Sequence, residues 1–339
     1  MYKFTYDHWD EERFPGYRES MNAIYDRSTT FYLKYDLEEY PNNNEFAKLM
    51  ELFGYMEYYY AALLKMGFVD NNNFSNVLEQ LKNIRLIRLM DPSLRKRFNG
   101  LTHHNIIMMN PTPGRFPNLD QEESLQLATF HELGHIITSS NTEDIEYLKQ
   151  VILKEPEKIQ KDYPEGIDYW KKGFELLDEV SVHNAAEAVL YDKIEKERPE
   201  AQNYSNPSMY SEGNFKSNFS EYREFQELAY TFACCLDFIP HKENDSMCDV
   251  LNNLSKAMFS RIFCTDMFLE LTRNPSKGED LVKMLICMGK VKDAKYACFG
   301  LESDTDTEID VTKYIQDFYS IAEKYMKKKN SKTKQKIQG

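Results

Sequence analysis

Apolar residues recur at helical spacing over most of this 339-residue chain. From Glu45 to Met66 they return every three or four positions, which predicts an amphipathic helix that ends at Gly67. A second helix is predicted from about Ser75 to Met90, before Asp91-Pro92. Further helices are predicted at 143–158, about 173–196 and 221–238, with three or four more within 244–326.

Two short apolar segments have the character of strands instead. One is Phe31–Leu37, and the other is Leu101–Asn110, which follows the turn residues Asn99-Gly100. The predicted fold class is therefore mainly α (α+β), a helical protein with a small sheet. Its edge strand, at 101–110, is expected to flank the helix that carries the main motif.

That helix begins at Asp120, where Asp120-Gln-Glu-Glu123 forms a predicted capping box. The residues that follow are apolar on most sides, which predicts a largely buried helix. Within it lies His131-Glu132-Leu133-Gly134-His135, an H-E-x-x-H sequence.

In a helix, His131 and His135 lie on one face, one turn apart, and can offer two imidazoles to one metal ion. Glu132 points roughly 100° further round the axis, so its carboxylate can act on a water as general base without ligating the metal. Two histidines on a buried helix need partners for their ring nitrogens, and zinc is one such partner. The plainer interpretation is two histidines on a solvated or half-buried helix face.

This motif resembles the active-site helix of the zincin metallopeptidases, in the glutamate-ligand branch (gluzincins, thermolysin-like). The resemblance implies a bound Zn²⁺ and a third ligand, a Glu on a later helix. Glu179, which follows Asp178 and lies 44 positions after His135, fits that role. The resemblance also implies that an extended substrate adds to the edge strand at 101–110. It covers roughly positions 100–195.

Other residues compete for roles at such a site. His183 lies one turn after Glu179, where thermolysin-like enzymes often carry an acid, and could orient Glu179, help to ligate, or simply pack. Glu224 and Glu227 are rival third ligands, because their helix weakly resembles one in zinc peptidases that cleave phage-type repressors.

Four further side chains are candidates for the site, and each also has a plainer interpretation as a surface or core residue. His103 and His104 alternate in direction on a strand, so at most one of them faces the cleft. Tyr222 or Tyr230 could stabilise an oxyanion, but the chain has 23 tyrosines and most have other roles.

Composition limits the partners and the compartment. The net charge of −13 argues against nucleic-acid binding. No apolar run is long enough for a membrane span, and the first residues lack a signal-peptide core. The six cysteines form no C-x-x-C pair, which favours reduced thiols and a cytoplasmic protein, although leaderless secretion would leave no sign. The oligomeric state stays open.

The chain is expected to divide into an N-terminal helical lobe (1–100), a zincin-like catalytic core (101–240), a C-terminal helical region (241–326) and a disordered Lys-rich tail (327–339). The predicted function is a zinc metallopeptidase acting on a peptide or protein, with Glu132 as general base and His131, His135 and Glu179 as metal ligands. In that case the Glu179 carboxylate should lie about 4 Å or less from both histidine nitrogens. The alternatives are a regulatory peptidase specific for one intracellular protein and a non-enzymatic helical binding protein with a relic metal site.

Overall fold

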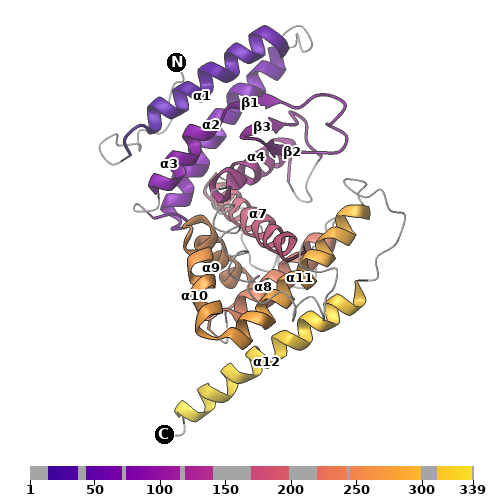
Figure 1. Ribbon diagram of the computed structural model, residues 1–339. Coiled ribbons are helices and arrows are strands. Elements are labelled where there is room, and N and C mark those ends of the chain that lie inside the picture. Colours follow the sequence, from indigo (N-terminus) through magenta and orange to yellow (C-terminus); the bar gives the residue numbers. More distant parts are fainter. Residues whose placement is uncertain are drawn as a thin grey trace. The chain divides into compact units, whose positions relative to one another are not determined.

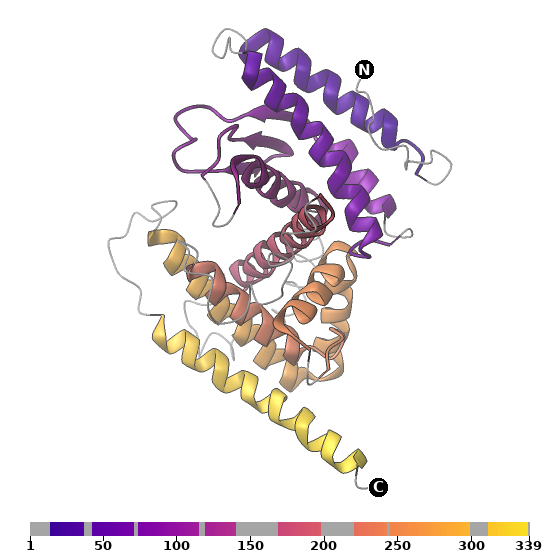
Figure 2. The same ribbon diagram turned by 180° about the vertical axis from the view of Figure 1, so that it is seen from behind.

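The computed structural model confirms a mainly helical fold with a small three-stranded sheet (Figures 1 and 2). It describes residues 14–36, 43–70, 74–114, 119–139, 169–197, 220–242, 245–298 and 311–337. The helix expected at 143–158 lies outside these ranges.

Contacts between residues divide the chain into two compact units. Unit 1 comprises Met1–Ser140 and Val182–Met209, and unit 2 comprises Asn141–Ser181 and Tyr210–Gly339. The boundary at 181/182 falls inside helix α7 (Tyr169–Glu197), which continues through it without a break. The division expected from the sequence, with limits at 100, 240 and 326, stays a prediction.

Unit 1 begins with helical elements that include a short π-helix. They are α1 (Tyr17–Phe31), the π-helix η1 (Tyr32–Asp36), α2 (Asn43–Lys65), α3 (Phe74–Asn83) and α4 (Gln121–Thr138). The strand predicted at Phe31–Leu37 is therefore wrong, because the chain stays helical as far as Asp36. The Tyr32 amide bonds to the carbonyls of Ser28 and Thr29, and the buried Tyr32 ring packs on Phe46.

The second predicted helix ends earlier than expected, at Asn83 instead of Met90. The apolar segment after it forms strand β1 (Leu86–Leu89), which pairs in parallel with β3 and contacts α1 and α2. Its residues are apolar except Arg88, and so short a segment does not separate a strand from a buried helix by periodicity alone.

The segment predicted as one strand at 101–110 is a hairpin of two strands. β2 (Gly100–His103) and β3 (Ile106–Met109) are antiparallel, and the sheet order is β1-β3-β2. His104 and Asn105 form the two-residue turn with φ values of 48° and 62°, as a tight hairpin requires. β2 is therefore the strand at the edge of the sheet, and β3 is central.

Helix α4 contacts strands β2 and β3 and also helices α2 and α3. In Figure 1 it lies beside the β2 edge of the sheet. Its predicted capping box is present: the Asp120 carboxylate accepts from the Glu123 amide at 2.9 Å, and the Glu123 carboxylate accepts from the Asp120 amide at 2.8 Å. The Phe130 ring stacks on Tyr59, with centroids 5.1 Å apart. These contacts fix the start and the middle of the helix that carries the motif.

Unit 2 contains the first part of α7 and five further helices in the described residues. They are α8 (Ser220–Cys235), α9 (Met247–Phe259), α10 (Ile262–Arg273), α11 (Pro275–Cys298) and α12 (Thr312–Ile337). Helix α12 lies along α11 and α8 (Figure 2). Its backbone is helical as far as Ile337, although the Lys-rich segment from 327 was expected to be disordered; Lys and Gln have a high helix propensity.

Two glycines let α7 and α11 approach each other within unit 2. A methyl group at Gly173 would lie 2.2 Å from the Leu285 carbonyl oxygen, and one at Gly289 would lie 1.9 Å from the Tyr169 carbonyl oxygen. The backbones are therefore in contact, and neither position accepts a side chain. None of the described helices is long and apolar enough to cross a lipid bilayer.

Candidate metal centre

The two histidines of the motif point to a common place beside α4. Their Nε2 atoms lie 3.0 Å apart, and the rings are nearly perpendicular, at 86°, with centroids separated by 4.7 Å. Two nitrogens bound to one tetrahedral zinc at usual distances lie about 3.3 Å apart. The spacing of one helical turn thus produces nearly the separation that a shared ion needs.

Glu179 brings a carboxylate to the same place from helix α7. One carboxylate oxygen of Glu179 and one nitrogen each of His131 and His135 lie within 4.8 Å of one another, and all three residues are half-buried. Over the described ranges this is the one group of three such residues that could hold a metal ion. This 4.8 Å limit is wider than the distance of about 4 Å that shared zinc ligation would require. The structure nevertheless brings together the three residues that the sequence predicted as ligands.

Gly134, inside the motif, allows α7 to come this close. A methyl group there would lie 2.6 Å from Cγ1 of Val182 and 3.2 Å from the hydroxyl of Tyr59. Val182 is three residues beyond Glu179, nearly one turn of the same helix. The missing side chain at Gly134 therefore sets how near Glu179 lies to the histidines.

Glu132 lies next to this group but does not belong to it. Its side chain is only 7% exposed, and its carboxylate is directed at strand β2. The Thr102 hydroxyl donates a hydrogen bond to Glu132 Oε2 at 2.7 Å, and a methyl group at Gly100 would lie 2.8 Å from Glu132 Oε1. Neither Thr102 nor Gly100 was expected to contact Glu132, because the contact joins segments about thirty residues apart in the chain.

His183 lies beside the group and contacts a different acid. Its Nε2 is 3.2 Å from Glu187 Oε1, and its ring centroid is 5.7 Å from that of His131. Both members of this pair are largely buried. His183 is therefore not a member of the group of three, and its role as an orienting or a packed residue stays a prediction.

The rival third ligands lie in α8 and have other neighbours. Glu227 pairs with Arg223 at 3.1 Å. Burial raises the pKa of Tyr319, and the charges of Glu227 and Glu224 raise it further, so both acids lie near that ring. Neither belongs to the group of His131, His135 and Glu179.

The remaining candidates are not part of the group either. His103 and His104 are exposed at the tip of the hairpin, with ring centroids 3.9 Å apart. Burial raises the pKa of Tyr230, which also contacts Cys234. The side chain of Tyr222 lies outside the described part of the chain.

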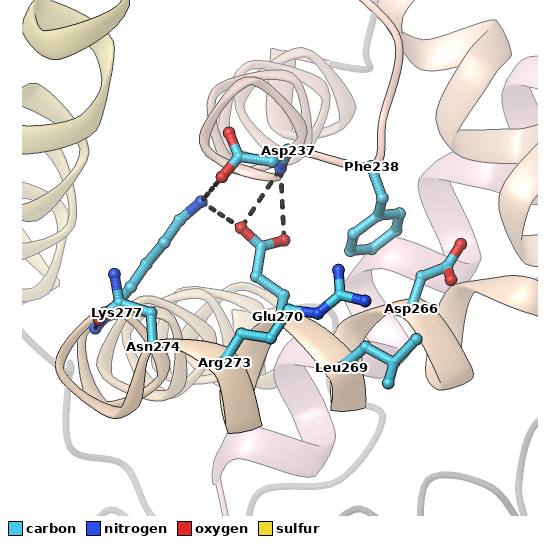
Figure 3. Close-up of a pocket in the computed structure, with 8 residues that line it drawn as sticks. All are labelled: Asp237, Phe238, Asp266, Leu269, Glu270, Arg273, Asn274 and Lys277. Carbon is cyan, nitrogen blue, oxygen red and sulfur yellow. Dashed lines mark hydrogen bonds and ion pairs between the residues drawn. The ribbon is translucent and has the colours of Figure 1, made fainter.

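A separate hollow in unit 2, about 370 Å³ in volume, contains a cluster of charges (Figure 3). The Lys277 ammonium group, on a side chain only 7% exposed, contacts the carboxylates of Asp237, at 2.8 Å, and Glu270. Glu270 also accepts from the Asp237 amide at 3.3 Å. These contacts tie the end of α8 to α10 and α11, so a structural role accounts for the cluster.

Comparison with known proteins adds no relative to this description. No family model matches the chain, and neither a curated protein nor a solved structure is significantly similar to it. Any assignment of function therefore depends on the residues and geometry described above.

Proposed function

We propose that this protein is a zinc-dependent peptidase of the glutamate-ligand type. The observation that carries the proposal is the meeting of His131, His135 and Glu179 from two helices, with Glu132 beside them and outside the group. A pair of histidines packed for structural reasons would not require a carboxylate from another helix at the same point.

The donor set fits a catalytic zinc site. Two imidazole nitrogens and one carboxylate oxygen are a known catalytic combination, and three protein ligands leave a fourth position for water or substrate. A structural site would be expected to supply four protein ligands. When bound, zinc would lower the pKa of a water molecule and polarise the carbonyl group of the substrate.

Glu132 has the position of a general base. In the proposed reaction its carboxylate takes a proton from the attacking water and later gives it to the leaving amine. Oε2 accepts a hydrogen bond from the Thr102 hydroxyl, which holds the carboxylate in place. His131, His135 and Glu179 would hold the ion.

The substrate of such a site would be a peptide in extended form. In the described residues β2 pairs only with β3, so its other edge can form backbone hydrogen bonds with an added strand. Glu132 touches this strand, so a segment that lies along β2 would pass close to the general base.

The test combines metal content with hydrolysis of a peptide library made by digesting a proteome, read by mass spectrometry. The wild-type protein should bind one zinc ion and produce new peptide ends, and a chelator should stop cleavage. Glu132→Gln should keep the zinc and lose about 10²–10⁴-fold in rate, the usual contribution of a general base. His131→Ala and Glu179→Gln should lose stoichiometric zinc, whereas Glu227→Gln, which changes an acid outside the group, should keep it.

Several results would contradict the proposal. If Glu132→Gln kept zinc and full activity, Glu132 would not be the base. A protein that binds zinc and cleaves neither the library nor intact proteins would be a binding protein with a structural metal site. Cleavage of one intact protein and of no library peptide would identify the regulatory form of the same peptidase.

A further inference from the structure

We propose that Thr102 is a positioning residue for Glu132, and that Gly100 provides the space this requires. Strand β2 would then serve the reaction by holding the general base, in addition to any role as the edge of the sheet. The inference rests on the proposed function, since Glu132 must be the base for its position to affect catalysis.

The hydrogen bond from Thr102 selects one arrangement of the Glu132 carboxylate. The hydroxyl is 2.7 Å from Oε2 and 3.3 Å from the Glu132 carbonyl oxygen. A hydroxyl has one proton to donate, and the shorter contact is the stronger of the two. Oε2 is therefore the oxygen that Thr102 holds in place, and with it the orientation of the whole carboxylate.

Gly100 matters because it has no side chain. A methyl group there would lie 2.6 Å from Cγ, 2.8 Å from Oε1 and 3.0 Å from Cδ of Glu132. Contacts this short do not occur, so any other residue at this position would push the carboxylate away from its place. The requirement is for space alone, since Gly100 does not have the positive φ that favours glycine.

The two residues act together because they are two apart on a strand. Alternate residues of a strand point to the same face, so Gly100 and Thr102 both face α4, with a gap at one and a donor at the other. Leu101 and His103 face the opposite side. The tight turn at His104-Asn105 fixes which residues form each pair, and His103 lies opposite Ile106.

The experiment compares three variants by zinc content, thermal stability, kcat and KM, on a peptide that the wild type cleaves. Thr102→Val keeps the shape and removes the donor; it should bind zinc in full and lose about 10- to 100-fold in kcat, the rate equivalent of a hydrogen bond to a charged group. Its KM should change less than about threefold, because the substrate contacts are unchanged. Thr102→Ser restores the donor and should restore kcat to within about threefold of the wild type.

Two controls separate positioning from a general loss of structure. Thr29→Val removes a hydroxyl that donates to backbone carbonyls of α1 and should leave kcat unchanged. In a Glu132→Gln background, Thr102→Val should cause almost no further loss, because there is then no base to position. Gly100→Ala should resemble Thr102→Val, with zinc bound and kcat reduced.

The outcome that overturns the inference is a Thr102→Val protein with zinc bound and wild-type kcat. Equal impairment of Thr102→Ser and Thr102→Val, with a lowered Tm in both, would also overturn it and indicate a packing role. Either result leaves the proposed function intact, because the wild type still cleaves and Glu132→Gln does not. A wild-type protein that binds zinc and cleaves nothing would refute the proposed function, and this positioning role with it.

Discussion

Replacing Gly134 by alanine tests whether the close approach of two helices creates the metal site. The added methyl group would lie 2.6 Å from Val182 Cγ1, whereas carbon atoms pack best at about 3.5–4.0 Å, so α7 or the Val182 side chain has to move by about 1 Å. Alanine favours a helix over glycine by about 1 kcal/mol, and overpacking costs about 1–3 kcal/mol. We expect a net loss of up to about 2 kcal/mol in the free energy of unfolding.

The effect on zinc should be larger than the effect on stability. Glu179 is carried by the same helix as Val182, so a shift of about 1 Å at Val182 displaces its carboxylate relative to the two histidines. Loss of a contact that orients a ligand commonly lowers metal affinity about 10- to 100-fold, and we expect a decrease of this size. The assay is competition for zinc with a chelating dye, beside denaturant unfolding of the metal-free protein.

The matched control removes the methyl group that the alanine would meet. Gly134→Ala combined with Val182→Ala should recover most of the zinc affinity, although the protein would be less stable because a buried valine is truncated. Val182→Ala alone should bind zinc almost as the wild type does. Full zinc affinity in a folded Gly134→Ala protein would show that the separation of α4 and α7 does not govern the site, and the reasoning would then be refuted.

Three further predictions concern the rest of the chain. The buried hydroxyl of Tyr59 has no hydrogen-bond partner among the described residues, so Tyr59→Phe should raise the free energy of unfolding by about 1–3 kcal/mol; a decrease would reveal a bound water or another partner. Burial raises the pKa of Tyr59, Tyr60 and Tyr191, whereas the unfolded phenols ionise near pH 10. Stability should therefore be complete below about pH 10 and fall above it by up to about 1.4 kcal/mol per pH unit for each of these tyrosines, and their phenolate absorbance should appear only on unfolding, after that of the exposed tyrosines. Lys277→Met should lower the free energy of unfolding in urea by about 3–5 kcal/mol, because it leaves the largely buried Glu270 carboxylate without its ammonium partner. The double variant Lys277→Met with Glu270→Gln should lower it clearly less.

The sequence predicted the features of the fold that depend on local chemistry. The capping box at Asp120–Glu123 and the helix through His131 and His135 follow from residues close to one another in the chain, and both are present. The pair His131 and His135 needed only the helical repeat. Glu179 was predicted as the third ligand from a family resemblance, and its position near the two histidines is seen only in the structure.

What the sequence did not predict depends on contacts between distant segments. Leu86–Leu89 is a short segment, apolar except for Arg88, that suits a helix or a strand, and its pairing with Ile106–Met109 decides between them. The roles of Thr102 and Gly100 likewise depend on their contact with Glu132, thirty residues or more away in the chain. Local patterns carry no information on such pairs.

The two-residue turn at His104-Asn105 has a consequence for how this chain can change. Substitutions at the exposed turn are compatible with the strand pairing, provided that the new residues accept a positive φ. A single inserted residue that shifted β2 by one position would send Thr102 to the opposite face and bring Leu101 or His103 against Glu132. The loop should therefore vary in composition and keep its length, although it lies at the surface where insertions are usually harmless.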